Sequence, residues 1–178
     1  MYPQWRSMMD RENAVEILAQ AGQRMFLEPG VSLQVLNPAV NSAVGMPKDQ
    51  NNNGVVLGLV YDEVSFLLAA DIEAEAENRL VRSGPTHVPS GASTIESAVL
   101  KVAHHGSLTS TTSAFLARVS PSVAVISVGA ANRFGHPRPE ILERLAEAIG
   151  EDAIFRTDRD GTVEFISDGQ ALLVKTDR

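Results

Sequence analysis

Two apolar runs separated by two acidic residues limit most strongly how this chain can fold. The runs occupy residues 54–61 (GVVLGLVY) and 64–70 (VSFLLAA), and Asp62 and Glu63 stand between them. Short apolar runs bounded by turn residues are typical of buried strands. A two-residue break between such runs is typical of a hairpin turn. We therefore predict a strand, a tight turn and a second strand.

Strand-like and helix-like segments alternate along the rest of the chain. Further strands are predicted at 31–36, 97–103, 123–128, 153–156, 162–166 and 171–175, and helices at 10–21, 72–81, 112–119 and 138–149. Loops are predicted at 37–53, 83–93 and 129–139. This order predicts an α/β fold in which helices cover a mixed sheet and the chain ends in a small meander. At 178 residues we expect one domain, spanning 1–178.

The composition restricts the classes of function. The formal net charge is −7, which counts against a protein that binds nucleic acid by charge alone. An enzyme that gathers phosphate around a metal ion remains compatible, because the ion supplies local positive charge. Without cysteine, a metal site must use His, Asp and Glu. No apolar run reaches the roughly 20 residues that span a bilayer, so we expect a soluble domain without membrane contact.

Four side chains that bind metals or protons follow predicted strands. They are Asp71, His104, His105 and His136. In layered α/β proteins, strand ends deliver side chains into a shared crevice. Their common placement predicts a functional site at one edge of the sheet.

Each candidate also has a purely structural explanation. Asp71 precedes a predicted helix, so its carboxylate either caps that helix or binds a metal ion, and the two roles can coexist. Of His104 and His105, one would be a ligand or acid/base group and the other would orient it or pack behind it. Gly106 permits close backbone approach, and Ser107 either caps the next turn or binds a phosphate oxygen.

The loop before the last predicted helix holds the remaining candidates. Pro137 biases His136 towards extended geometry. Arg133 has the chemistry to pair with a phosphate, and Asn132 to hold the loop. The alternative is a capping loop with an exposed histidine. Two structural predictions complete the set. Residues Glu73, Glu75 and Glu77 are expected on a solvated helix face, and Lys101 at an edge or snorkelling to solvent.

Taken together, the motifs resemble the metallo-β-lactamase superfamily, specifically the ComEC-type DNA internalization proteins of bacteria. The motifs that carry the resemblance are NNN at 51–53, FLLAAD at 66–71, LKVAHHGS at 100–107, VISVG at 125–129, NRFGHP at 132–137 and RTDRDG at 156–161. Their order and rough spacing match over about residues 20–168. Several independent motifs therefore agree.

The resemblance implies an αββα sandwich and a divalent metal, zinc or manganese. It implies Asp71 as the carboxylate ligand, His104 or His105 as a metal-binding or acid/base histidine, and His136 as a ligand or a phosphate contact. Of these alternatives we expect His104 to bind the metal with Asp71, and His105 and His136 to be the catalytic groups. From the chemistry of their side chains, we expect Ser107, Asn132 and Arg133 to bind the substrate. The implied reaction is phosphodiester hydrolysis by a metal-bound water, with single-stranded DNA as the substrate. Full-length relatives are expected in the bacterial cell membrane.

Two departures from the family pattern shape the expectation. The His-x-His-x-Asp-His motif that supplies the main ligands is absent, and Ala69-Ala70-Asp71 stands in place of Thr-Gly-Asp. We therefore expect the C-terminal part of such a domain, with weak or no metal binding by itself. The sheet face left uncovered would be buried in a homodimer. The alternatives are a non-catalytic remnant or recognition module of the same fold, and a hydrolase of another ester class.

Overall fold

The structure, a computed structural model, describes residues 2–39, 50–82 and 95–178. The strands are β1 (Arg24–Glu28), β2 (Val31–Asn37), β3 (Val56–Tyr61), β4 (Val64–Leu68), β5 (Val99–Lys101), β6 (Val123–Ile126), β7 (Ile154–Arg156), β8 (Val163–Ser167) and β9 (Leu172–Thr176). The α-helices are α1 (Tyr2–Arg11), α2 (Ala74–Arg82), α3 (Ser113–Val119), α4 (Pro139–Ile149) and α5 (Thr157–Asp160), and short 3-10 turns cover Ala103–Gly106 and Glu151–Ala153. The predicted loops at 37–53 and 83–93 lie largely outside the described residues.

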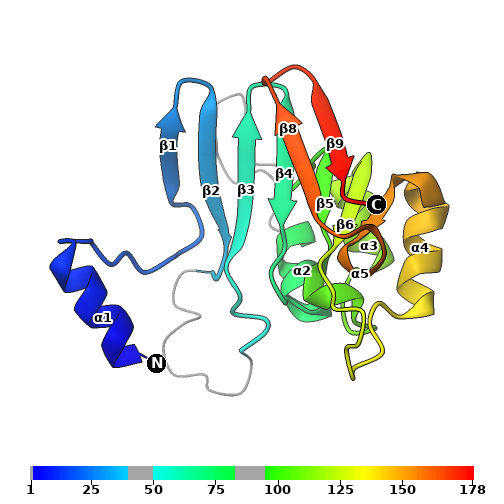
Figure 1. Cartoon of the computed structure of the whole chain (residues 1–178), viewed down its shortest axis with the longest axis horizontal. Coiled ribbons are helices and arrows are strands. Elements are labelled where there is room, and N and C mark those ends of the chain that lie inside the picture. Colours follow the sequence, from blue (N-terminus) through cyan, green and yellow to red (C-terminus); the bar gives the residue numbers. More distant parts are fainter. Residues whose placement is uncertain (1, 40–49, 83–94) are drawn as a thin grey trace.

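The main sheet has seven strands in chain order, β1 to β7 (Figure 1). Strands β1 to β4 are antiparallel to their neighbours, whereas β4 to β7 run parallel. The predicted hairpin is confirmed as β3 and β4, in which Tyr61 pairs with Val64. Because β4 to β7 are parallel, their carboxyl ends meet at one edge of the sheet. The predicted α/β class with a mixed sheet is also confirmed.

Helices α2, α3 and α4 cover one face of this sheet. They pack on strand residues such as Leu67, Leu100 and Ile126, which are completely buried. The helix side chains in the same core include Ala76, Phe115, Ile141 and Leu145. Alternation along β4 sends the neighbouring Phe66 to the opposite face, where its ring meets Phe165 of β8 edge-on at 5.7 Å.

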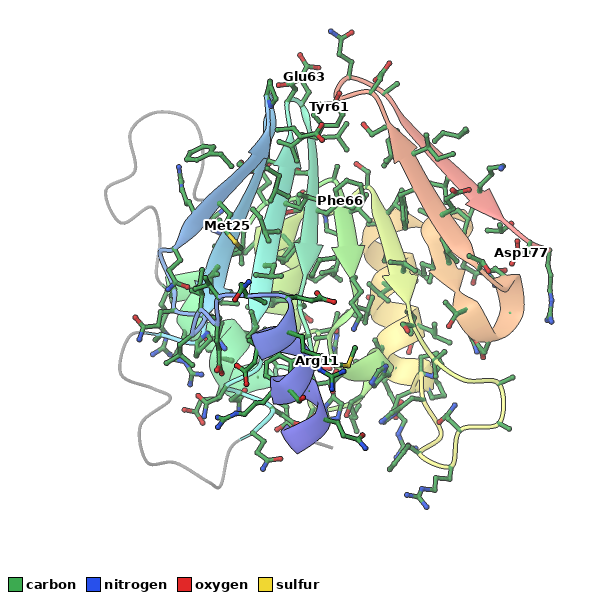
Figure 2. The ribbon with its side chains drawn as sticks, turned by 60° about the vertical axis from the view of Figure 1, so that its left-hand side comes forward. Arg11, Met25, Tyr61, Glu63, Phe66 and Asp177 are labelled. Atoms are coloured by element: carbon green, nitrogen blue, oxygen red, sulfur yellow. The ribbon has the colours of Figure 1, made fainter. Side chains whose placement is uncertain are left out.

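The β8–β9 hairpin covers only part of the second face. The two strands form a separate sheet, and β7 pairs with β6 in the main sheet, so the predicted terminal meander was wrong. The helical turn α5 between β7 and β8 redirects the chain. The hairpin lies far from β1, where Met25 stands (Figure 2). Met25, Phe26 and Leu27 are exposed on β1. A homodimer that covers such a surface stays a prediction.

The helix predicted at 10–21 was also wrong. Helix α1 ends at Arg11, and the side chains of Val15 and Leu18 are 82% and 66% exposed. A short helix needs a surface on which to bury its apolar stripe, and these side chains have none in the described structure. The exposed strand β1 was not predicted.

A buried carboxylate joins two of the helices that cover the sheet. Glu77 was predicted to be solvated but is completely buried on α2. Its carboxylate accepts the backbone N–H groups of Thr111 and Thr112, just before α3. Burial raises the pKa of Glu77, while these hydrogen bonds and the charge of Arg144 oppose the rise. The helical periodicity predicted that Glu77 would share a solvated face with Glu73 and Glu75. Its hydrogen bonds to the segment before α3 instead hold it in the core.

Removing this carboxylate should destabilise the fold. We expect Glu77→Ala to lower the free energy of unfolding by about 1–3 kcal/mol at pH 7, because two N–H groups lose their acceptor. The exposed Glu75→Ala should stay within about 0.5 kcal/mol. Since the folded-state pKa of Glu77 lies above the ordinary 4.5, the advantage of wild type over Glu77→Ala should shrink as pH rises above that value. Urea unfolding from pH 4 to 8 measures both effects; equal losses in the two variants would contradict this role.

Candidate functional site

The predicted site residues come together at the carboxyl ends of β4, β5 and β6. Asp71 follows β4, His104 and His105 follow β5, and His136 lies in the loop after β6. The Oδ1 atom of Asp71 lies 3.6 Å from Nε2 of His105. The rings of His104 and His136 have centroids 6.0 Å apart. The parallel strands therefore form one cluster from residues more than 60 positions apart in the chain.

Asp71 does not cap the helix that follows it. The side-chain oxygen of Asn52 accepts the N–H groups of Glu73 and Ala76 at the start of α2. Among the described residues, no hydrogen bond links the Asp71 carboxylate to α2. With about half of its side-chain surface exposed, the carboxylate faces the cluster and is available to a ligand. The structural explanation for Asp71 is thereby weakened.

A left-handed residue directs Asp71 into the cluster. Ala70 has φ of 50°, and its carbonyl accepts the N–H of His104, which ties the end of β4 to the end of β5. A residue with a Cβ atom is strained in this region by roughly 1–2 kcal/mol. In the motif that the sequence resembles, this position is a glycine, which adopts the conformation freely.

Restoring the glycine should stabilise the protein. We expect Ala70→Gly to raise the free energy of unfolding by about 0.5–1 kcal/mol, because relief of the strain exceeds the added freedom of the unfolded chain. Ala69 is buried and has no positive φ, so Ala69→Gly should destabilise instead. Thermal unfolding of the two variants measures the contrast. If both lower the melting temperature, Ala70 is not strained.

The adjacent histidines occupy a sharp turn with two left-handed residues, at φ of 47° for His104 and 56° for His105. Nδ1 of His105 lies 2.6 Å from the carbonyl oxygen of Ser127, which directly follows β6. A carbonyl only accepts hydrogen bonds, so Nδ1 carries the proton. In neutral His105, Nε2 therefore presents its lone pair towards Asp71.

His104 faces a different carboxylate. Its Nδ1 lies 3.4 Å from Oε1 of Glu73 but has no hydrogen-bond partner in the described structure, although it is buried. Glu73 also accepts hydrogen bonds from Asn51 and Thr109. The prediction of a solvated glutamate missed this role. The sequence offered one sign that Glu73 belongs to the site: it directly precedes α2 and lies two residues after Asp71.

The loop after β6 is held rigidly against the histidine turn. The side chain of Asn132 donates to the carbonyls of Gly129 and His136 and accepts the N–H of His136. The carbonyl oxygen of Gly106 accepts the N–H of Arg138, and a Cβ on Gly106 would lie 2.6 Å from Cβ of Pro137. The predicted close approach at Gly106 is therefore confirmed, and the amide of Asn132 positions His136.

This positioning can be measured at a single amide. We expect Asn132→Ala to speed hydrogen exchange at the His136 N–H by about fivefold or more, because the side-chain oxygen that accepts this N–H is lost. Arg133→Ala changes a neighbouring side chain that holds no backbone group in the described loop. That control should leave the exchange rate unchanged. Equal rates in wild type and Asn132→Ala would show that the loop is held by other contacts.

Electrostatics favour a neutral His136. Its pKa is lowered by burial first and then by the charges of His104, Arg138 and His105. Its Nδ1 is buried without a hydrogen-bond partner among the described residues. Lys101, at the end of β5, lies near the same cluster: burial lowers its pKa and the charge of Asp71 opposes the change. Because β5 is flanked by β4 and β6, the prediction that Lys101 lies on an edge strand was wrong, and its alternative, a side chain that snorkels to solvent, stays a prediction.

The Asp71–His105 pair fits two positions around one metal ion. Ligand atoms about 2.1 Å from a tetrahedral zinc ion lie roughly 3.4 Å from each other, close to the 3.6 Å observed. The hydrogen bond to Ser127 resembles the outer contacts that orient metal-binding histidines. Within residues 2–39, 50–82 and 95–178, no three His, Asp or Glu side chains converge as a complete metal site.

An open groove of about 350 Å³ adjoins the pair. Its lining includes His105, Ser127, Asn132, Phe134, His136 and Thr157. Arg133 is exposed beside it, and no carboxylate pairs with its guanidinium in the described part of the chain. Ser107 is buried and its hydroxyl contacts Thr109, so the structure shows the turn-capping role predicted for it. A phosphate contact by Ser107 stays a prediction.

Comparison with known proteins identifies relatives of this chain, although no family model matches it. It is 34% identical over 119 residues to ComE operon protein 3 of Bacillus subtilis, covering 67% of this chain and 14% of the relative. It is 32% identical over 137 residues to competence protein ComA of Neisseria gonorrhoeae, covering 76% and 18%. Recombination protein 2 of Haemophilus influenzae is 34% identical over 117 residues, covering 65% and 13%.

The relatives of this chain are competence proteins of the ComEC type. This agrees with the family suggested by the sequence motifs. The chain spans less than a fifth of the length of these relatives. In the described part of the chain, no helix has the length and apolar character needed to cross a membrane.

Proposed function

We propose that this chain forms the C-terminal part of a metal-dependent hydrolase domain of the metallo-β-lactamase superfamily. The complete domain would cleave phosphodiester bonds of single-stranded DNA during DNA uptake. One observation carries the proposal: Asp71 Oδ1 and His105 Nε2 face each other at 3.6 Å, and Nδ1 of His105 lies 2.6 Å from the Ser127 carbonyl, so in neutral His105 the Nε2 lone pair would be available to a metal ion. Kinship with competence proteins supports DNA as the substrate.

The contacts favour a division of roles between the two adjacent histidines. The sequence left open which of the two binds the metal, and we expected His104 as the ligand and His105 as the catalytic group. The distance to Asp71 instead supports His105 as the ligand, with zinc or manganese as the ion. A bound ion would activate a water molecule and polarise a phosphoryl oxygen. His104, between Glu73 and His136, and His136 itself would then hold or transfer protons, and Arg133 would contact phosphate.

Two protein ligands are fewer than catalytic zinc uses. Such sites have three protein ligands and an open position for water. The Asp71–His105 pair would therefore bind an ion weakly until further ligands join it. The family pattern attributes those ligands to a His-x-His-x-Asp-His segment, which is not in this sequence. This accounts for the low metal affinity and low activity expected of the 178-residue chain.

Metal binding and cleavage should be measured on this chain and on a chain extended upstream in its gene to include that segment. We expect tight Mn²⁺ or Zn²⁺ binding and cleavage of labelled single-stranded DNA only by the extended chain. Removing the ion with a chelator should abolish cleavage. In the extended chain, Asp71→Ala or His105→Ala should lower the cleavage rate by about 100-fold or more. Loss of a residue that hydrogen-bonds to a metal ligand already costs about 10–100-fold in activity, and loss of the ligand itself should cost at least as much.

The exposed Glu75→Ala serves as the matched carboxylate control and should leave cleavage unchanged. Tight stoichiometric metal binding by the 178-residue chain would contradict the proposal that this chain holds only two of the metal ligands. An extended chain that binds metal but leaves DNA intact would contradict the proposed nuclease activity.

A second candidate function is a recognition module of the same fold that no longer catalyses. It is favoured by the lack of a three-ligand cluster among the described residues. A module of this kind would bind DNA with or without a metal ion and would cleave neither DNA nor a small phosphodiester dye. Cleavage of a β-lactam but not of the phosphodiester dye would instead assign the domain to another ester class.

A further inference from the structure

Three flat side chains gather at the rim of the groove. The rings of Phe134 and His136 are nearly parallel, at 15°, with centroids 6.0 Å apart. The guanidinium carbon of Arg133 lies 5.4 Å from the centre of the Phe134 ring. Phe134 and His136 both line the groove that contains His105. An aromatic surface with a neighbouring cation therefore borders the Asp71–His105 pair.

The surface is open and its backbone is held in place. The Phe134 side chain is 63% exposed, which leaves most of an apolar ring in contact with water. The loop that carries it is fixed by the Asn132 hydrogen bonds to Gly129 and His136. A ring on a fixed loop loses little freedom when a ligand stacks on it, so it is suited to binding.

The charges of this segment differ from those of the whole chain. The net charge of the chain is −7, yet residues 127–139 contain two arginines and no acidic residue. Arg133 and Arg138 therefore favour an anionic ligand at this rim. Single-stranded nucleic acid combines phosphates with bases that stack on aromatic rings and on Arg guanidinium planes. A simple phosphate would use the arginines but not the ring.

We propose that Phe134, flanked by Arg133 and His136, is a stacking platform for one nucleobase of single-stranded DNA. The base lies on the exposed Phe134 ring, and Arg133, which is itself exposed, leaves the ring for the adjoining phosphate. This inference rests on the proposed function, since it places the strand beside the Asp71–His105 pair. It adds a preference for strands with unpaired bases, because a base within a duplex has no free face.

Binding of the intact chain to two fluorescent strands tests the platform at low salt. One strand is oligothymidylate, and the other is an abasic strand of equal length and charge. Wild type should bind oligothymidylate about 10-fold more tightly, as one stacked base provides. Phe134→Ala should remove this preference, and Phe134→Trp should keep it. Leu173→Ala removes a similarly exposed apolar side chain from β9 and should change nothing.

The inference is overturned if wild type binds neither strand, if it binds both equally, or if Phe134→Ala keeps the preference. Loss of the preference in Leu173→Ala would overturn it as well. Circular dichroism checks that each variant is folded, which the exposure of both side chains favours.

Failure of the platform can be separated from failure of the proposed function. In the extended chain, Phe134→Ala should slow cleavage of single-stranded DNA but not of a small phosphodiester dye that has no base. If binding depends on the base while no phosphodiester is cleaved, the stacking platform is supported and the proposed nuclease activity is refuted. If the dye is cleaved but binding does not depend on the base, the nuclease activity is supported and the platform is refuted.

Discussion

Parallel pairing of β4, β5 and β6 is the constraint on which the site depends. It brings Asp71, the His104–His105 turn and the loop of His136 to one sheet edge, and two backbone hydrogen bonds then connect these segments. One runs from His104 N–H to the Ala70 carbonyl and the other from Arg138 N–H to the Gly106 carbonyl. Because these bonds join backbone atoms, the side chains are placed by the sheet itself and not by flexible surface contacts.

Local strain accompanies this arrangement. Ala70, His104 and His105 all have positive φ, at a cost that only well-packed surroundings sustain. The surroundings here are the fully buried core beneath α2 and α3 and the buried Glu77, which fixes the start of α3. Strained residues that gather around polar side chains are typical of functional sites. The backbone conformation of these residues places Nε2 of His105 near Asp71 and Nδ1 of His104 near Glu73.

The sequence predicted the elements whose signals are local. The β3–β4 hairpin follows from two apolar runs and an acidic turn, and Asp71 and the histidines could be placed because each follows a strand. Long-range contacts escaped prediction. Asn52 caps α2 from 21 residues upstream of Glu73, and Glu77 is buried because Thr111 and Thr112 need an acceptor. Residues 10–21 have helical periodicity but no surface to cover, so periodicity alone misled.

The residues of the proposed site lie on two kinds of backbone segment, the turns that follow strands and a loop. Asp71 and His105 lie in short turns just after β4 and β5, and the hydrogen bond from His104 N–H to the Ala70 carbonyl ties these turns together, so the pair proposed to bind the metal would be held at a fixed distance. Phe134 and Arg133 stand on a loop that the Asn132 side chain fixes, so their environment can change without disturbing the sheet. In the proposed function, chemistry and strand recognition would therefore use separate parts of the fold, and a change in the loop would alter what is bound while the Asp71–His105 geometry persists.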